Sequence, residues 1–396
     1  MLTDKKIVLG VTGSIAAYKA VDLASKLTQA GAQVDVIMTK AATEFVTPLT
    51  FRSLTHRPVV TEMFDPNSEL SVEHVSLARR ADIVVIAPAT ANTIAKLALG
   101  IADDMLSSTV LATKAPVVIA PAMDANMYEN PVTQENLSRL KARGATIVGP
   151  ATGHLATGAI GIGRLVETEQ IIGTIRQVLG GQGDLAGKRV VVSAGPTEEP
   201  IDPVRNITNR SSGKMGYAIA EAARDRGAQV VLVSGPVALP GPVGIEVVKV
   251  QTTQQMRDAV FAATRGADVL IMAAAPADYR PAASAEQKIK KEKADTLSIE
   301  LIRNPDILGE VQGDFIKVGF AAESEELLEN AKEKLARKGA HLFVANDITA
   351  TDAGFDVDTN RVAIIDRSGR IENLPLMLKS EVAEKILDRV VELLNA

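Results

Sequence analysis

Short apolar runs alternate with helical segments along the whole chain, and this alternation constrains the possible folds more than any other feature of the sequence. In the first half, the runs expected as buried strands span residues 6–11, 33–39, 81–88, 116–123 and 145–149. In the second half, they span residues 189–194, 229–234, 267–275, 316–321 and 341–345. Apolar runs of this kind with helices between them are typical of parallel sheets covered on both faces. The sequence therefore predicts an α/β protein with two doubly wound, Rossmann-like domains.

The length of the chain agrees with two domains. Its 396 residues exceed one typical domain, and a hydrophobic content of 46% is enough for two cores. The segment 179–187, LGGQGDLAG, is glycine-rich and weakly patterned, as a linker would be. We therefore expect a first domain over residues 1–178, a linker over 179–187 and a second domain over 188–396.

Composition and charge exclude several classes of function. The 43 basic and 48 acidic residues give a net charge of −5, which argues against a general nucleic-acid or anionic-membrane binder. The chain has no cysteine, so disulfides, thiolate metal sites and cysteine nucleophiles are excluded. The four histidines lack the close spacing of a zinc site. No uninterrupted run of about 18 apolar residues and no signal-type segment occurs, so we expect a soluble, cytoplasmic protein.

The segment from Gly195 to Gly216, GPTEEPIDPVRNITNRSSGKMG, places a polar and basic loop directly after a predicted strand. A helix is expected to follow it over residues 217–226. Ligands of doubly wound sheets bind where strand ends meet loops and helix N-termini, so this loop is a candidate phosphate site. A plain glycine–serine turn with one solvated lysine is an equally good interpretation, because the full P-loop spacing is missing. The phosphate-binding residues would be Ser211, Ser212, Gly213 and Lys214.

The first strand leads into a similar loop, within KIVLGVTGSIAAYK at residues 6–19. Its glycine-containing turn into a helix suits a phosphate, although an ordinary tight connection can have the same pattern. Polar residues also follow later strands, at Thr39, in APATANT at 87–93 and in SST at 107–109. Because such loops meet at one edge of the sheet, a phosphate and a flat ring could be held there.

Several motifs resemble known enzyme families. GSIAAYK, EHVSLARRADIVVIAPATANTIAKLALGIADD and APAMDANMYENP resemble the flavin-dependent cysteine decarboxylases, whose members bind FMN. GPTEEPIDPVRNITNRSSGKMG, AAAPADYRP, KIKK, RNPDIL, GFAAE and VANDI resemble the phosphopantothenate–cysteine ligases. In this order on one chain, and nearly from end to end, they resemble the bifunctional phosphopantothenoylcysteine decarboxylase/phosphopantothenate–cysteine ligase family of coenzyme A biosynthesis.

For the second domain, the resemblance implies CTP-dependent joining of 4'-phosphopantothenate to cysteine through an acyl-cytidylate, with Mg²⁺ and lysines around the triphosphate. It implies catalytic roles for Asn209, which would donate to the developing oxyanion, and for Lys288. Asp278 is the candidate magnesium ligand. Without the resemblance, the lysines of the helix ENAKEKLARKG fit a solvated helix face equally well. Substrate contacts are expected at Arg205, Arg210, Ser211, Ser212, Gly213 and Lys214. CTP contacts are expected at Met272, Ala273, Ala274, Asp278, Lys288, Pro305, Asp306, Ile307, Leu308, Phe320, Lys334 and Lys338.

For the first domain, the resemblance implies FMN-dependent decarboxylation of 4'-phosphopantothenoylcysteine to 4'-phosphopantetheine, in which oxidation of the thiol creates the electron sink for loss of CO₂. His74 matches the essential histidine and would act as base or proton manager. Without the resemblance, His74 fits an exposed histidine at a helix start and Phe45 a core residue. FMN contacts are expected at Gly13, Ser14, Ile15, Thr39, Phe45, Ala89, Thr90, Ser107 and Ser108. Substrate contacts are expected at Asp124, Met127, Gly158 and Arg164.

Two positions depart from the family pattern, both in the decarboxylase half. Asp124 stands where the family has an asparagine that binds the substrate carboxylate, and an ionised Asp124 would repel that carboxylate. Thr157 stands where the family has the cysteine that donates the final proton, and threonine is a far weaker acid. Three hypotheses remain: a working decarboxylase in which water, another group or Thr157 as a relay supplies the proton; one that releases the enethiol; and an FMN-binding, regulatory domain fused to an active ligase.

The resemblance also implies how the chain assembles and what it binds. A homo-oligomer is expected, a dodecamer built from decarboxylase trimers and ligase dimers. Its partners would be small-molecule substrates, and neither nucleic acid nor a membrane. Arg205 and Arg210 are the candidates for holding the substrate phosphate.

Overall fold

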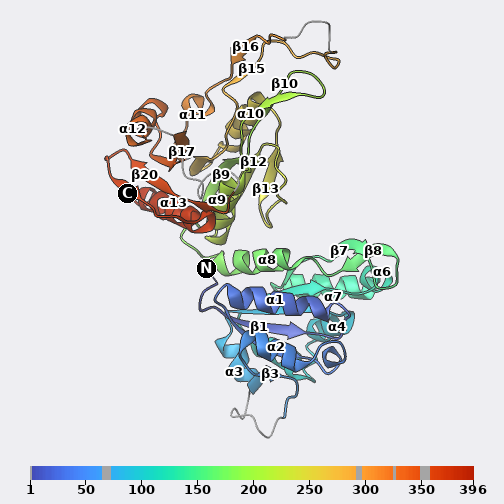
Figure 1. Ribbon diagram of the computed structural model, residues 1–396. Coiled ribbons are helices and arrows are strands. Elements are labelled where there is room, and N and C mark those ends of the chain that lie inside the picture. The colour runs from blue at the N-terminus through green and yellow to red at the C-terminus, as the bar shows by residue number, and fades with distance from the viewer. Residues whose placement is uncertain (1, 65–72, 291–296, 324–326, 348–356) are drawn as a thin grey trace. The chain divides into compact units, whose positions relative to one another are not determined.

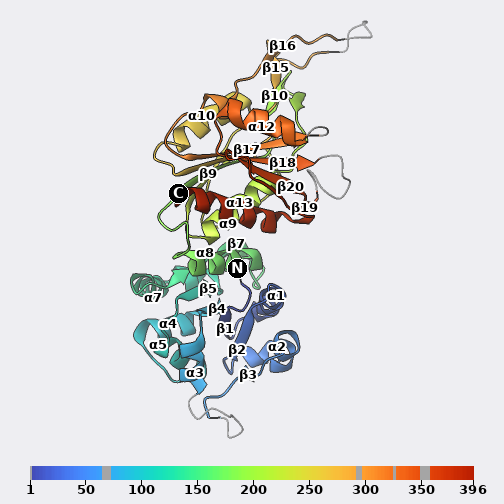
Figure 2. The same cartoon turned by 90° about the vertical axis from the view of Figure 1, so that its left-hand side faces the viewer.

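The computed structural model describes residues 2–64, 73–290, 297–323, 327–347 and 357–396. The chain divides into two compact units, Met1–Leu179 and Gly180–Ala396, and each is a layered α/β structure (Figure 1; Figure 2 gives a second view). Within the described residues, the structure contains no helix of the length and apolarity that a membrane span requires.

The first unit is built on a six-stranded parallel sheet with the strand order β3-β2-β1-β4-β5-β6. This order is the one expected for a doubly wound fold, and it brings the ends of β1 and β4 together at the centre of the sheet. The strands predicted in this half are present, some of them shorter, and the short β3 is additional. Their bounds are β1 (Lys6–Val11), β2 (Gln33–Met38), β3 (Val59–Val60), β4 (Ile83–Ala89), β5 (Val117–Pro121) and β6 (Thr146–Ile147).

Helices cover both faces of this sheet because each buries one apolar side. Leu23 and Leu27 of α1 pack with Ile171 and Ile175 of the last helix in one core, and a second core lies on the opposite face. The helices are α1 (Ala17–Gln29), α2 (Pro48–Thr55), α3 (Glu73–Arg80), α4 (Ala91–Leu99), α5 (Met105–Ala112), α6 (Ala125–Glu129), α7 (Pro131–Ala142) and α8 (Thr168–Gly180).

The second unit contains an eight-stranded sheet with the order β13-β12-β9-β14-β17-β18-β20-β21. The pairs from β13 to β18 are parallel, whereas β20 and β21 are antiparallel and extend one edge, which the alternation of the sequence did not predict. The strands are β9 (Arg189–Ala194), β12 (Gln229–Ser234), β13 (Glu246–Lys249), β14 (Val269–Met272), β17 (Ile316–Glu323), β18 (Leu342–Asp347), β20 (Val362–Asp366) and β21 (Ile371–Asn373).

Helices also cover both faces of the second sheet. α9 and α13 pack on one face, and α10 and α11 on the other. α9 begins at Lys214, three residues before the predicted start, because Gly213 takes a left-handed conformation with φ of 75° and turns the chain into the helix. The helices are α9 (Lys214–Asp225), α10 (Thr253–Ala263), α11 (Ile307–Glu310), α12 (Leu327–Lys338) and α13 (Lys379–Leu394).

Short antiparallel ladders project from the ends of the sheets and carry several of the predicted site residues. In the first unit, the segment that contains Thr157, Gly158 and Arg164 forms a hairpin. Part of the expected linker packs onto the second unit, because Leu185 is fully buried in its core and Asp184 pairs with Arg226 at 2.5 Å. The ladders are β7 (Ala151–His154) with β8 (Ile160–Arg164), β10 (Glu198–Pro200) with β11 (Asn206–Thr208), β15 (Tyr279–Pro281) with β16 (Leu301–Arg303), and β19 (Thr359–Asn360) with β22 (Met377–Leu378).

Candidate active sites

Two cavities of the second unit share part of their walls and contain most of the residues predicted for the ligase. The first, of about 460 Å³, is called the loop cavity because residues 209–216 line it. The second, of about 720 Å³, is called the helix cavity because the segment 303–308 and the end of α12 line it. Both cavities are lined by Ala274, Pro276, Asp278, Phe320 and Lys334. A ligand could therefore extend from one cavity into the other.

The loop cavity brings Asn209 against the segment that follows β14. The Asn209 amide nitrogen donates to the carbonyl oxygen of Pro276 at 2.9 Å and, less closely, to that of Ala275 at 3.4 Å. These bonds fix the amide beside the predicted residues Arg210, Ser211, Ser212, Gly213 and Lys214 of the loop and Ala273 and Ala274 of the facing segment.

A buried polar network holds four segments of the chain together beside the loop. The Glu199 carboxylate accepts from the backbone N–H of Thr253 at 2.8 Å and from its hydroxyl at 2.7 Å. The hydroxyl of Thr197 lies 2.8 Å from that of Thr253 and accepts from the N–H of Ala277. Asn304 donates to the Ala277 carbonyl at 2.8 Å. Sequence reasoning did not single out these polar residues, although Thr197 and Glu199 lie inside the specific motif that follows β9.

Except for Lys288, the helix cavity contains the other predicted CTP residues: Met272, Pro305, Asp306, Ile307, Leu308 and Lys338. Lys338 forms an ion pair with Asp306, so these two predicted residues bind each other. Burial opposes ionisation of Asp306, but Lys338 and the N–H of Gly309 outweigh it and lower the pKa of this carboxyl. Arg303 and Arg337 also line the cavity and were not predicted. Four cations, counting Lys334, therefore line this cavity, together with the carboxylates of Asp278, Asp306 and Glu310.

Arg205 and Lys288 are not among the described residues that line these two cavities. Arg205 donates to the buried Asp202 through Nε at 3.0 Å and Nη2 at 2.5 Å, and these bonds hold the pKa of Asp202 well below its usual range. Asp202 also accepts the backbone N–H of Ile289, and Arg205 donates to the Ile289 carbonyl. In this structure, Arg205 therefore anchors the backbone next to the exposed Lys288.

Three further polar residues line the loop cavity without having been predicted. Asn346 is the penultimate residue of β18, and its position after the predicted strand 341–345 was a usable signal. Asn360 and Lys379 come from β19 and the start of α13, and no local pattern indicated that they would reach this cavity. Asp278, the candidate magnesium ligand, is exposed and faces both cavities. Across the described part of the chain, no cluster of three or more His, Cys, Asp or Glu side chains could hold a metal by itself.

In the first unit, six of the nine predicted flavin residues lie at or just after the ends of β1, β2 and β4. Gly13 allows the loops after β1 and β2 to approach closely, since a Cβ atom there would lie 2.4 Å from the Cβ of Ala41. Thr39 directly follows β2, Ala89 ends β4, and Thr90 caps α4.

Thr12 connects two of these loops, and sequence reasoning missed it. Its side chain is 1% exposed, and its hydroxyl donates to the Pro88 carbonyl at 2.7 Å and accepts the Thr90 N–H at 3.1 Å. It therefore ties the end of β1 to the start of α4.

A cavity of about 470 Å³ joins the loop after β1 to the predicted substrate residues. Ser14 and Ile15 line it together with Asp124, which follows β5, and with Thr157 and Arg164 of the β7–β8 hairpin. We call it the hairpin cavity. Gly163 lets the hairpin lie against β5, because a Cβ atom there would be 2.2 Å from the Met123 carbonyl oxygen. The structure thus brings predicted flavin and substrate residues together.

The two departures from the family pattern have clear positions in the hairpin cavity. Asp124 caps α6, because its carboxylate accepts the N–H of Asn126 at 2.9 Å. Thr157 is exposed in the turn between β7 and β8, next to Gly158 with its φ of 85°. Arg164 pairs with Glu167 at 2.5 Å, and Lys19 pairs with the same carboxylate at 3.3 Å.

The remaining predicted residues of the first unit lie elsewhere. His74 is half-buried on α3, and neither it nor Met127 is among the described residues that line the hairpin cavity. Phe45 is 49% exposed and is therefore not a core residue. Ser107 and Ser108 are buried in the first turn of α5, where Ser107 and Asp104 form a capping box.

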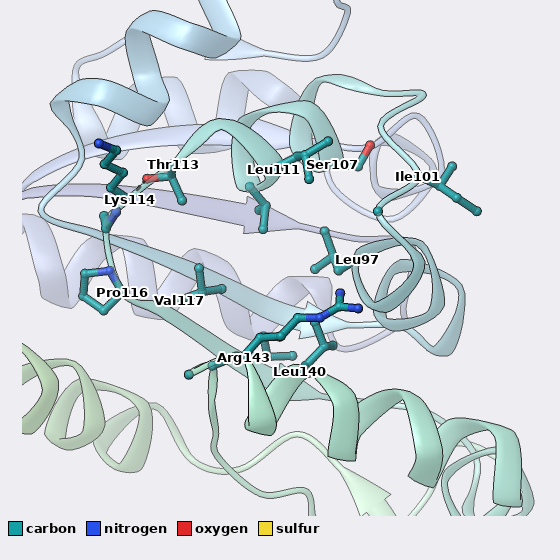
Figure 3. A pocket seen from close by; sticks show the side chains of 16 residues that line it. Leu97, Ile101, Ser107, Leu111, Thr113, Lys114, Pro116, Val117, Leu140 and Arg143 are labelled. Carbon is teal, nitrogen blue, oxygen red and sulfur yellow. Dashed lines mark hydrogen bonds between the residues drawn. The ribbon is translucent and has the colours of Figure 1, made fainter.

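Ser107 also lines a separate, largely apolar cavity of about 520 Å³ (Figure 3). Figure 3 shows Leu111 between Lys114 and Ser107, with Leu140 and Arg143 together on the facing side. Among the predicted site residues, Ser107 is the one that lines this apolar cavity.

Comparisons with known proteins match both units. The flavoprotein family model matches residues 1–180, and the model described as the DNA/pantothenate metabolism flavoprotein C-terminal domain matches residues 185–394. The coenzyme A biosynthesis bifunctional protein CoaBC of Vibrio vulnificus strain YJ016 is 45% identical over 399 residues, with 100% of this chain and 99% of that protein covered. The CoaBC protein of Bacillus subtilis strain 168 is 46% identical, with 99% and 98% covered.

Among solved structures, the C-terminal domain of a CoaBC protein is 42% identical, with a TM-score of 0.47 over 54% of this chain and 98% of that one. The FMN-dependent cysteine decarboxylase SpaF is 35% identical, with a TM-score of 0.38 over 41% of this chain and 91% of that one.

Proposed function

The chain belongs to the family of coenzyme A biosynthesis bifunctional proteins, and we propose that it catalyses two consecutive reactions of that pathway. Residues 188–396 would join 4'-phosphopantothenate to cysteine at the expense of CTP. Residues 1–178 would then decarboxylate the product, 4'-phosphopantothenoylcysteine, to 4'-phosphopantetheine with FMN. The observation that supports this proposal is the shared wall between the loop cavity, which Asn209 lines, and the helix cavity, which Lys334 and Lys338 line and which we propose as the nucleotide site.

In the ligase reaction, the phosphopantothenate carboxylate attacks the α-phosphorus of CTP and pyrophosphate leaves. The cysteine amine then attacks the acyl carbon of the cytidylate, and CMP leaves. The cations of the helix cavity, Lys334 and Lys338 among them, stabilise the charge of the triphosphate. Asn209 would donate to the developing oxyanion, and its long 3.4 Å bond to Ala275 is the one that a substrate oxygen would replace. Lys288 would reach the nucleotide from its exposed segment.

Magnesium would be bound mainly by the phosphates of CTP. Asp278 is the protein ligand we propose, because it is exposed and faces both cavities. One carboxylate together with substrate phosphates is an ordinary arrangement for Mg²⁺.

The residues at the sheet edge of the first unit fit a flavin mononucleotide. No side chain caps the N-terminus of α1, so its N–H groups beside Gly13 and Ser14 suit the phosphate. Ile15 and Phe45 are 57% and 49% exposed and offer apolar faces to the ring. Thr39, Ala89, Thr90, Ser107 and Ser108 complete the proposed set. When bound, FMN supplies the reversible oxidation of the substrate thiol that makes loss of CO₂ possible.

In decarboxylation, the residues of the protein itself would bind the substrate and transfer protons in the hairpin cavity. Arg164 and Lys19 bring positive charge to a substrate that carries carboxylate and phosphate groups. Thr157 would relay a proton from water to the product, while Asp124 keeps its carboxylate directed to the N–H of Asn126. His74 would act as the base. Met127 and Gly158 complete the substrate contacts that we propose.

We propose that the protein works as a cytoplasmic homo-oligomer, with decarboxylase trimers and ligase dimers combined in a dodecamer. In such an assembly, His74 of a neighbouring copy would complete the hairpin cavity. The residue that holds the substrate phosphate in the ligase is proposed to be Arg210, which lines the loop cavity, rather than Arg205, which is bound to Asp202.

The test is to incubate the purified full-length chain with phosphopantothenate, cysteine, CTP, Mg²⁺ and FMN and to follow the products by mass spectrometry. Phosphopantetheine is the expected product. Accumulation of phosphopantothenoylcysteine would support the ligase and exclude the decarboxylase, and a product two mass units below phosphopantetheine would locate the defect at the final reduction and protonation. Ligase activity that does not need CTP, or that persists in full in Asn209→Ala, would contradict the proposed ligase site.

A further inference from the structure

Lys317 is a buried cation to which the proposed reaction gives no role. It is the second residue of β17, and its side chain is 9% exposed on the sheet face that α11 covers. Burying an ammonium group is costly unless all of its N–H bonds find acceptors. Its partners therefore show what the residue does.

Among the described residues, the Lys317 ammonium has three hydrogen-bond partners, and all are backbone carbonyl oxygens. Nζ donates to Val311 at 2.7 Å, to Leu308 at 3.3 Å and to Lys338 at 3.4 Å. A lysine ammonium has three N–H donors, so this set satisfies them. The bonds are charge-assisted and, at the shortest distance, strong.

These three carbonyls lie at the C-terminal ends of two helices. Leu308 belongs to α11, Val311 is its C-cap, and Lys338 is the last residue of α12. Carbonyl groups at helix C-termini lack partners inside the helix and carry partial negative charge. A single ammonium group therefore caps both helices and fixes the distance between their ends.

Both helices contribute to the helix cavity. The chain around α11 supplies Asp306 and Leu308, and the end of α12 supplies Lys334 and Lys338. Lys317 itself is not among the described residues that line this cavity, and it lines a different one with His341 and Arg367. It can influence a ligand in the helix cavity only through the two segments that it holds.

We propose that Lys317 is a positioning residue for the nucleotide site: its ammonium joins the ends of α11 and α12, so that the cations of α12 face the segment 305–308 at the spacing that the nucleotide needs. The identity of that nucleotide as CTP rests on the proposed function. The link between the ends of α11 and α12 rests on the three hydrogen bonds of Lys317 and can be tested without CTP.

The first test measures hydrogen–deuterium exchange of the full-length chain without nucleotide. In Lys317→Met, which keeps the length of the side chain but has no donor, amides of 307–311 and 335–340 should exchange about tenfold faster, while those of β9 and α9 should not change. Lys317→Arg should restore slow exchange, because guanidinium can reach the same carbonyls. Unchanged exchange at both segments in Lys317→Met would overturn the proposal.

The second test separates positioning from a general loss of stability. In Lys317→Met, the KM for CTP should rise about tenfold or more, whereas the KM for cysteine should change less than about twofold. Lys188→Met is the matched control, since Lys188 belongs to the same unit but pairs with Asp268 at the surface, and its KM values should stay unchanged. If the KM for cysteine rose as much as the KM for CTP, or if only kcat fell, the role would be merely structural and the proposal would be wrong.

Failure of the proposed function and failure of a variant to fold can both be told apart from failure of the role proposed for Lys317. A wild-type protein that uses no CTP would contradict the proposed function, and the exchange experiment would still decide whether Lys317 joins the two helices. If Lys317→Met does not fold, Lys317→Gln replaces it, because its amide retains two donors and should give a smaller change in the same two segments.

Discussion

Replacing Thr12 by valine should destabilise the first unit and weaken its binding of FMN. Valine has nearly the same shape as threonine but has no hydroxyl group, so it leaves the packing intact and removes both hydrogen bonds of the side chain. The Pro88 carbonyl then loses a 2.7 Å donor and the Thr90 N–H a 3.1 Å acceptor. Because Thr90 is a proposed flavin contact, the same change should loosen the loop that receives the cofactor.

The size of the effect follows from the burial of these groups. A buried polar group left without a partner costs about 1–3 kcal/mol, and Thr90 is only half-buried, so the two losses together should lower the free energy of unfolding by about 2–4 kcal/mol. For a unit of this size, that loss corresponds to a fall in melting temperature of about 4–16 °C. Thr12→Ser is the matched control, because it keeps the hydroxyl and loses one methyl group, worth about 1 kcal/mol.

The assay is thermal unfolding of the full-length, FMN-loaded chain, followed by the rise in flavin fluorescence on release. This signal reports on the first unit, and circular dichroism reports on the whole chain in the same experiment. The expected order of melting temperature is wild type, Thr12→Ser, then Thr12→Val. The reasoning would be refuted if Thr12→Val released its flavin at the same temperature as Thr12→Ser.

Three further changes test other parts of the structure. Asp124→Asn should lower the KM for the carboxylate substrate of the decarboxylase about tenfold without lowering the melting temperature, because asparagine caps α6 equally well and does not repel a carboxylate. An unchanged KM would mean that Asp124 does not face the substrate carboxylate. Thr157→Cys should raise the rate of phosphopantetheine formation about tenfold or more, since a thiol is the stronger acid, and an unchanged rate would assign the final proton to another group. His341→Asn should flatten the dependence of stability on pH. Burial first, and then Arg367 and Lys317, lower the pKa of His341. The folded chain therefore binds fewer protons than the unfolded chain, and its stability falls as the pH decreases below about 6.5. Urea unfolding at several pH values should show the wild-type stability approaching that of His341→Asn in acid, whereas parallel curves would contradict the assignment.

Much of the fold could be predicted because burial leaves a local record in the sequence. The bounds of β1, β9 and β12 coincide with the predicted apolar runs, since a strand covered on both faces needs apolar side chains at nearly every position. The antiparallel β20 and β21 were not predicted, because the alternation with helices that identified the other strands stops before them.

In the candidate sites too, the sequence predicted some features and left others to the tertiary structure. The motif that follows the predicted strand 189–194 located the loop at 209–216, and the family resemblance located the segment 305–308; both line adjoining cavities in the structure. The sequence did not indicate that Arg205 would be bound to Asp202, or that Asn360 and Lys379 would reach the loop cavity. A side chain's choice between a protein partner and a ligand depends on which distant groups the fold brings within hydrogen-bond distance.

By itself, the sequence determined the alternation of strands and helices, the two-domain plan and the family, because these depend on which residues are apolar and on contiguous motifs. Only the tertiary structure decided how Thr12 joins β1 to α4 and how Lys317 joins α11 to α12. Both side chains bind backbone groups of other segments, which only the fold brings within hydrogen-bond distance. Backbone carbonyls and N–H groups are the same at every residue, so no pattern of side chains could identify them as partners before the chain was folded.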